Sequence, residues 1–137
     1  MDDLDLKIIR EIKNNGKASI REIARRCSVS PGTVRNRIIE MEKEHIIIGF
    51  KARLQGKKIG MEEAILGLDV SPEHYFETLE SIKDLNFISE VYSTSGDHSA
   101  IAIIECPENE MNKCISEILK IRGVRNVYPS LVNTVIK

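Results

Sequence analysis

Apolar residues recur every three or four positions along the first 44 residues of this chain, which is the spacing of helices with one buried face. Asp2 or Asp3 can cap a first helix, in which the apolar positions are Leu4, Ile8, Ile9 and Ile12. Ser19, with a glutamate three residues later, forms the capping-box pattern that opens a second helix. A third helix begins at Ser30-Pro31, where proline suits the first helical position, and runs to about Glu44, after which His45 adopts the left-handed conformation. The sequence therefore predicts three short helices, the last two joined by a tight turn over residues 27–30.

The rest of the chain has the shorter apolar blocks of β-strands, separated by two helical segments. Strands are expected over 64–70, 87–95, 99–106 and 124–136, with helices after Ser71-Pro72 and after Pro107-Glu108. The third strand is so apolar that it is expected in the centre of the sheet, and Pro129 indicates a bend or an edge strand. The order βαββαβ predicts a ferredoxin-like sheet with both helices on one face. The fold class is α+β, with an N-terminal winged helix-turn-helix domain before this C-terminal domain.

The connection between the two halves contains a β-branched run followed by glycines. Ile46 to Leu54 predicts a short β-hairpin or wing, and Gln55 to Met61 is the connecting segment. We expect a helix-turn-helix domain with its wing at residues 1–52, a linker at 53–61 and a βαββαβ domain at 62–137.

The net charge of −1 conceals a strong asymmetry. Residues 1–61 carry 14 Lys and Arg against 8 Asp and Glu, whereas residues 62–137 carry 6 against 13. Only the first half is therefore expected to approach a polyanion. No apolar run is long enough for a membrane span, the acidic start has no signal-peptide pattern, and three scattered cysteines suit a reducing compartment. These features predict a cytoplasmic protein without a membrane partner.

The third helix combines an apolar stripe with polar residues that can read base pairs. Thr33, Asn36 and Arg37 are the candidates for base edges, since Asn pairs with adenine and Arg with guanine. Ser30 and Gly32 lie at the helix N-terminus, where free N–H groups suit a phosphate. Further phosphate contacts are expected from arginines on both helices, namely Arg21, Arg25, Arg26 and Arg35. The alternative is a plain three-helix bundle with solvated arginines.

The C-terminal domain is expected to associate with a second copy of itself. Its two helices can cover only one face of the sheet, so the other face stays wet or meets another sheet. Apolar groups are available to both faces from Val91, from Ile101 or Ala102, and from Ile103 or Ile104. The sequence therefore predicts a homo-oligomer.

No constellation for catalysis or metal binding stands out. His45, His74 and His98 are far apart in sequence, and the neighbours of His98 on its turn point to different sides, unlike a catalytic triad. Cys106 and Cys114 are too far apart for the close pairs of zinc sites. We expect no enzyme activity, no cofactor and no metal.

Taken together, the parts resemble the Lrp/AsnC family of leucine-responsive, or feast/famine, regulators. The resemblance covers nearly the whole chain and is carried by Leu4-Asp5-x-x-Ile8-Ile9, Ser30-Pro31-Gly32-Thr33-Val34 followed by Arg37-Ile38, Ile47-Ile48-Gly49-Phe50, Val91-Tyr92 and Thr94-x-Gly96-Asp97. It implies a transcription regulator that dimerises, and often forms octamers, through its C-terminal domain. It also implies an effector site for an amino acid or similar small molecule near Gly96, Asp97, His98 and Ser99. Because the family turn commonly reads Gly-Asp-x-Asp and this chain has Ser99 at the last position, another ligand, or none, stays open.

The resulting hypothesis is a sequence-specific regulator that binds double-stranded DNA as a homo-oligomer. The alternative is a small-molecule sensor or enzyme-regulatory subunit whose helical half binds protein.

Overall fold

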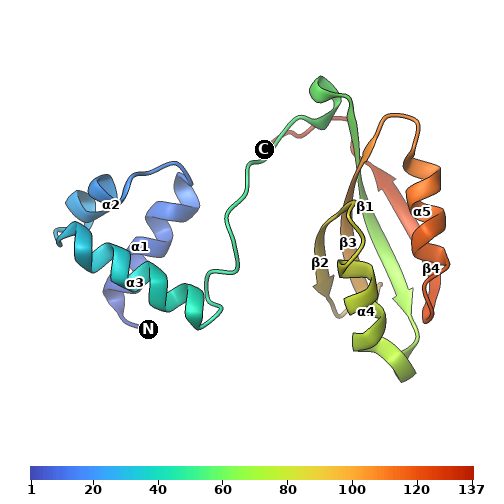
Figure 1. Cartoon of the computed structure of the whole chain (residues 1–137), viewed down its shortest axis with the longest axis horizontal. Helices are drawn as coiled ribbons and strands as arrows, with labels where there is room; N and C mark the ends of the chain where they lie inside the picture. The colour runs from blue at the N-terminus through green and yellow to red at the C-terminus, as the bar shows by residue number, and fades with distance from the viewer. The chain divides into compact units, whose positions relative to one another are not determined.

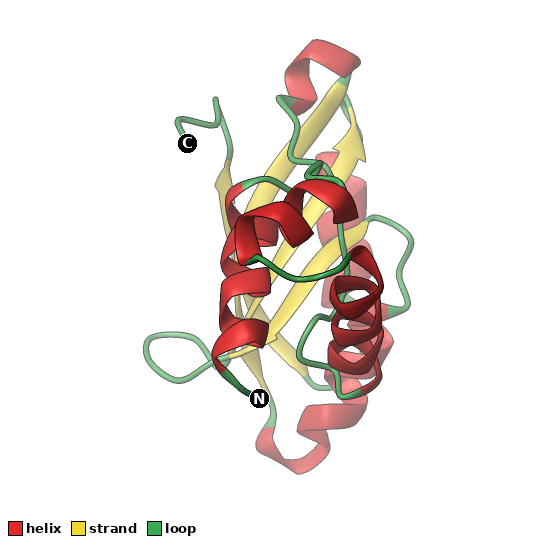
Figure 2. Ribbon diagram, turned by 90° about the vertical axis from the view of Figure 1, so that its left-hand side faces the viewer, coloured by secondary structure: helices red, strands yellow, loops and turns green.

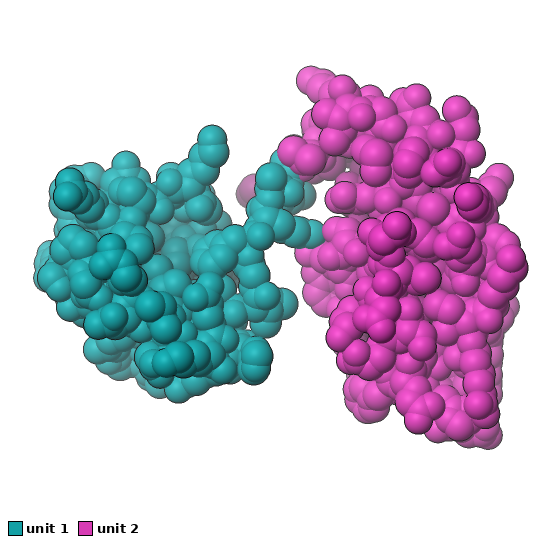
Figure 3. Space-filling model, viewed as in Figure 1, with its two compact units in different colours: residues 1–53 teal, residues 54–137 magenta.

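The computed structural model describes all residues, 1–137, and the chain divides into two compact units, Met1–Arg53 and Leu54–Lys137 (Figure 3). The first unit contains only helices, and all strands belong to the second (Figures 1 and 2). None of the helices is both long and apolar enough to cross a membrane.

The first unit consists of α1 (Asp3–Asn14), α2 (Ile20–Cys27) and α3 (Pro31–Lys43), each with a side-chain cap at its start. Asp2 and Asp5 form a capping box on α1, and Ser19 and Glu22 form the predicted one on α2. Each box satisfies backbone N–H groups that the first turn of a helix leaves without partners. The three predicted helices are thus confirmed, with boundaries set by local hydrogen bonds.

The core of the first unit is small and draws on all three helices. Its buried side chains are Ile8, Ile23, Ala24, Val34 and Met41. They come from the apolar stripe of each helix, so the amphipathic pattern accounts for how the helices pack.

The segment after α3 corrects one expectation. His45 has the predicted left-handed conformation (φ 56°), and the N–H groups of Ile46 and Ile47 both donate to the carbonyl of Met41. Residues 46–54 form no strand, so the predicted β-hairpin was wrong (Figure 1). A strand needs a neighbour for its backbone hydrogen bonds, and in the single chain none is present. Instead Ile47 packs on the core, while Ile48 is 90% exposed.

The second unit begins with a short 3₁₀ turn, η1 (Gly56–Ile59), and follows the predicted βαββαβ order. Its elements are β1 (Met61–Val70), η2 (Pro72–His74), α4 (Tyr75–Lys83), β2 (Ile88–Ser93), β3 (Ala100–Pro107), α5 (Met111–Leu119) and β4 (Val124–Leu131). The strand order is β2-β3-β1-β4, and all neighbours are antiparallel. The apolar strand β3 is therefore central, and Pro129 lies on the edge strand β4, as predicted.

Alternation along the strands separates a covered face from an open face. On β3, Ala102 and Ile104 are fully buried and pack in one cluster with residues of α4 and α5. Ile101 and Ile103 point to the opposite side of the sheet, where no helix covers them. We call the side-chain set of this uncovered side the open face: Ile65, Tyr92, Ile101, Ile103, Glu105 and Tyr128.

Candidate nucleic-acid interface

The turn between α2 and α3 is short and held by its own hydrogen bonds. Ser28 is left-handed (φ 57°), and the N–H of Val29 returns to the carbonyl of Ala24 at 3.0 Å. Ser30 then caps α3, so only three residues separate the two helices. This is the geometry of a helix-turn-helix unit, in which the second helix is presented to a groove.

The N-terminus of α3 has one backbone donor without a hydrogen bond, the N–H of Gly32. The hydroxyl of Ser30 accepts the N–H of Thr33 at 3.1 Å and also lies 2.8 Å from the hydroxyl of Thr33. Pro31 has no N–H, and the exposed Gly32 leaves its own N–H facing solvent in the first turn. The first turn of a helix attracts anions because its N–H groups and dipole point outward. Ser30, Gly32 and Thr33 thus lie together at a position suited to a phosphate.

Asn36 lies at the middle of the exposed side of α3. Val34 and Met41 are buried, and a residue two positions after Val34 points to the opposite side of the helix. Asn36 and Arg35 are both exposed. The side chain of Asn36 is therefore presented as a base-reading residue needs to be.

Arg37, in contrast, is bound to α1. Its Nη1 donates to Asp2 Oδ2 at 2.7 Å and to Asp5 Oδ1 at 3.1 Å, and the side chain is only 36% exposed. The hydrogen bond from Arg37, followed by the one from the Asp5 backbone, lowers the pKa of Asp2 to about 2. The same two carboxylates raise the pKa of Arg37. Sequence reasoning missed this contact because the partners are 35 and 32 positions apart and no local pattern links them.

The arginines of α2 are exposed but not equivalent. Arg21 and Arg25 are exposed, and the structure shows no ion pair for either. Arg26 is also exposed, and its Nη1 lies 3.4 Å from Glu11 Oε2 of α1. Cationic groups of Arg21 and Arg25 are thus available for phosphates on the helix that precedes α3.

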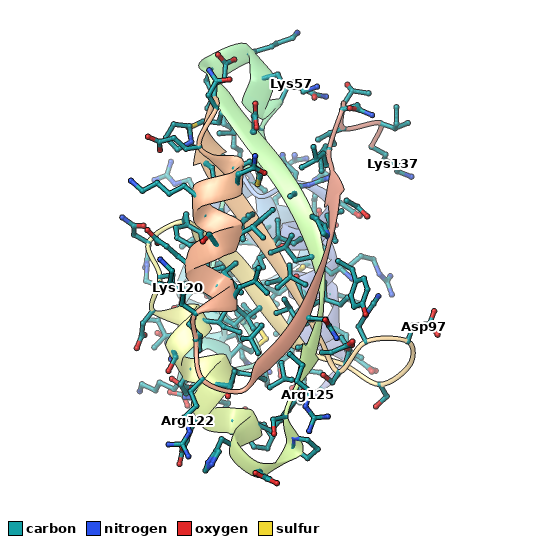
Figure 4. The ribbon with its side chains drawn as sticks, turned by 90° about the vertical axis from the view of Figure 1, so that its right-hand side faces the viewer. Lys57, Asp97, Lys120, Arg122, Arg125 and Lys137 are labelled. Carbon is teal, nitrogen blue, oxygen red and sulfur yellow. The ribbon has the colours of Figure 1, made fainter.

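The turn before β3, predicted as an effector region, has most of its polar groups occupied. The hydroxyl of Ser99 donates to the carbonyl of Leu68 at 3.1 Å and lies 2.9 Å from the donating N–H of Val70. The carbonyl of His98 accepts the hydroxyl of Thr94 at 2.8 Å. Gly96 has a positive φ of 129°, and Asp97 is exposed at the tip of the loop, pointing away from the sheet (Figure 4). Ser99 therefore ties the loop to β1, and an effector role of this turn stays a prediction.

The histidines and cysteines form no reactive arrangement. His98 Nδ1 lies 3.5 Å from Asp69, and its ring lies 5.0 Å from that of Tyr128. His74 Nε2 lies 3.0 Å from the guanidinium of Arg122. Burial, followed by a hydrogen bond with Cys114, raises the pKa of Cys106 to about 12. That thiol is therefore neutral at physiological pH and is a poor nucleophile.

Comparison with known proteins agrees with this geometry. A family model described as winged helix-turn-helix DNA-binding matches residues 1–48. The chain is 39% identical to the HTH-type transcriptional regulator Ptr1 of Methanocaldococcus jannaschii, over all of this chain and 93% of that protein. It is 34% identical to the HTH-type transcriptional regulator LrpA of Pyrococcus horikoshii, over 96% of each. The fold matches the solved leucine response regulatory protein LrpA of Mycobacterium tuberculosis with a TM-score of 0.81 at 18% identity, over all of this chain and 95% of that one.

A capped helix-turn-helix unit with exposed polar residues on its second helix, joined to a ferredoxin-like domain, defines a DNA-binding transcriptional regulator. The relatives are named as regulators over nearly their full length, and the chain spans that length. This chain belongs to the Lrp/AsnC family.

Proposed function

We propose that this regulator recognises a specific double-stranded DNA sequence through the exposed side of α3, with Asn36 as its central base-reading residue. The observation that carries the proposal is the position of Asn36, exposed opposite the buried Val34 and in the turn after the N-terminus of α3. An asparagine amide can pair with both polar atoms of adenine in the major groove. The methyl group of Thr33 is suited to contact a thymine methyl, since its hydroxyl is engaged with Ser30.

The arginines around this helix supply affinity rather than sequence preference. Arg21, Arg25, Arg26 and Arg35 are exposed on α2 and α3, where guanidinium groups can neutralise phosphates. Because Arg26 shares its guanidinium with Glu11, Arg21 and Arg25 are expected to contribute more than Arg26.

The test is a titration of purified variants against a duplex selected by the protein from a random pool. Asn36→Ala is expected to weaken binding to the selected duplex by about 5- to 150-fold, the range for a lost bidentate base contact, and to relax the preference at one base pair. Asn14→Ala, which removes an exposed amide from the end of α1, is the matched control and should leave the affinity unchanged.

Arg25→Ala should behave differently from Asn36→Ala in the same assay. It should weaken binding to all sequences alike and reduce the slope of log affinity against log salt by about 0.9, the value for one phosphate contact. Equal affinities of the wild type and Asn36→Ala, with the same selected sequence, would refute the assignment of Asn36.

The same proposal includes self-association through the open face of the second unit. Ile65, Tyr92 and Tyr128 are each between 43% and 49% exposed there. A second sheet packed on this face would remove them from water, at roughly 25 cal/mol per Å² of apolar surface. A dimer then presents two α3 helices to half-sites about one helical turn, or a multiple of it, apart.

A further inference from the structure

Arg37 lies on α3, but its side chain is hydrogen-bonded to the start of α1. In this it differs from its exposed neighbours on α3. Its Nη1 atom donates to both Asp2 and Asp5, at 2.7 and 3.1 Å. An end-on guanidinium fork to guanine needs this same nitrogen as one of its two arms. The observed contact therefore occupies the edge of Arg37 that an end-on contact to guanine would use.

The two carboxylates are fully shared between the helix cap and Arg37. Asp2 accepts the N–H of Asp5 on Oδ1 and the guanidinium on Oδ2. Asp5 accepts the N–H of Asp2 on Oδ2 and the guanidinium on Oδ1. Each oxygen thus has its own donor, and the cation sits between two negative charges at the N-terminus of α1, where the helix dipole also favours negative charge.

This arrangement connects the middle of α3 with the first turn of α1. Arg37 flanks the buried stripe of α3, where Val34 and Met41 pack in the small core with Ile8 of α1. Apolar contacts alone allow such a helix to rotate or slide by small amounts, whereas hydrogen bonds from one nitrogen to two fixed carboxylates restrict both movements. The direction in which Asn36 points depends on that rotation.

We propose that Arg37 is the positioning residue of the recognition helix: held by Asp2 and Asp5, it sets the orientation of α3 and thereby places Asn36, and it does not itself read a base. The inference rests on the proposed DNA-binding function. It deepens that function by assigning specificity to the exposed side of α3 and positioning to its α1-facing edge.

The two roles predict opposite effects of removing an acidic residue. If Arg37 reads DNA, then Asp2→Asn frees it and removes a negative charge near the polyanion, so binding tightens or stays the same. If Arg37 positions α3, then Asp2→Asn weakens binding. Asparagine is as good an N-cap as aspartate, so this variant keeps the start of α1 while it loses the charge that holds Arg37.

The experiment measures affinity for the selected duplex and its salt dependence for Asp2→Asn, Arg37→Met and the double variant. We expect each single variant to weaken binding about fivefold, the upper end for a partly exposed ion pair, and the double variant to weaken it by about the same fivefold rather than 25-fold. Arg37→Met keeps the apolar stem and should leave the salt slope unchanged, in contrast to Arg25→Ala. Asp3→Asn is the matched control, because Asp3 is an exposed acid of the same turn that does not contact Arg37, and it should not weaken binding.

The positioning role is overturned if Asp2→Asn binds as tightly as Asp3→Asn. It is also overturned if Arg37→Met behaves as the loss of a DNA contact, that is, if it lowers the salt slope by about 0.9 or relaxes the preference at one base pair, and Asp2→Asn has neither effect. Circular dichroism at the binding temperature confirms that each variant is folded. A wild-type chain that shows no salt-dependent duplex binding refutes the proposed function itself, and the positioning role with it.

Discussion

Gly123, between α5 and β4, offers the sharpest test of how the second unit is packed. Its φ is +98°, a conformation that other residues rarely adopt, and a Cβ added there would lie 3.3 Å from Thr78 Cβ and well inside contact distance of Thr78 Oγ1. Thr78 is only 2% exposed, and its hydroxyl lies 2.8 Å from the carbonyls of both His74 and Arg122. Gly123→Ala therefore strains the backbone and displaces a buried hydroxyl at the same time.

The expected loss combines two terms. The left-handed backbone costs an alanine roughly 1–2 kcal/mol, and a buried polar group that loses its partner costs about 1–3 kcal/mol. A total of about 3 kcal/mol would lower the melting temperature of a unit of this size by roughly 12–24 °C. The control Gly60→Ala has a similar backbone requirement (φ +76°) but no atom within 4 Å of the new Cβ, so it should cost only the first term.

Tyrosine fluorescence during urea or thermal unfolding measures the loss of stability in each variant. All three tyrosines (Tyr75, Tyr92 and Tyr128) lie in the second unit and the chain has no tryptophan, so the signal reports that unit alone. All variants are compared at one protein concentration, because association shifts apparent stability. Gly123→Ala and Gly60→Ala unfolding at the same midpoint would refute the argument, since the contact with Thr78 would then cost nothing.

Two further predictions concern association and the acid range. Ile101→Glu puts a charge in the middle of the open face and should shift the oligomer to monomers in analytical ultracentrifugation. The control Ile136→Glu, at an 89% exposed position near the C-terminus, should not. Unchanged association of Ile101→Glu would exclude the open face as the interface. The Asp2 carboxyl should titrate near pH 2 by NMR, and its pKa should rise toward the ordinary 3.8 in Arg37→Met, where the hydrogen bond from the Asp5 backbone still lowers it. Because the pKa of Asp2 is lowered in the folded state, its contribution to stability is present above about pH 4 and disappears as the pH falls toward 2. An Asp2 titration midpoint near 3.8 in the wild type would contradict the ion pair with Arg37.

Local sequence patterns determined the helices of the first unit. Ser19 with Glu22 and Ser30 with Thr33 bond across three residues, and His45 adopts the left-handed conformation expected after α3. Such interactions form between residues that are neighbours in the chain, so their effect can be read without knowing the fold.

Periodicity likewise determined that the second unit is a βαββαβ domain, but not which side of each strand is buried. The sequence left Ile101 or Ala102, and Ile103 or Ile104, as alternatives for the two faces. The register of β3 against β1 and β2 resolved them, with Ala102 and Ile104 under the helices and Ile101 and Ile103 on the open face. A shift of one residue would exchange the two sets, and only the pairing with neighbouring strands excludes that shift.

Only the tertiary structure showed that Arg37 contacts α1 and that residues 46–54 form no strand. From the sequence, Arg37 belongs with Asn36 as a base-reading residue, because both follow the start of the same helix. The fold brings it to Asp2 and Asp5, more than 30 positions away, where its hydrogen bonds connect α3 with α1. Residues 46–54 have the composition of a strand but form no strand in the single chain. The physical reason is the same in both cases: ion pairs and strand pairing depend on groups that are distant in sequence, whereas caps and amphipathic stripes depend on groups a few residues apart.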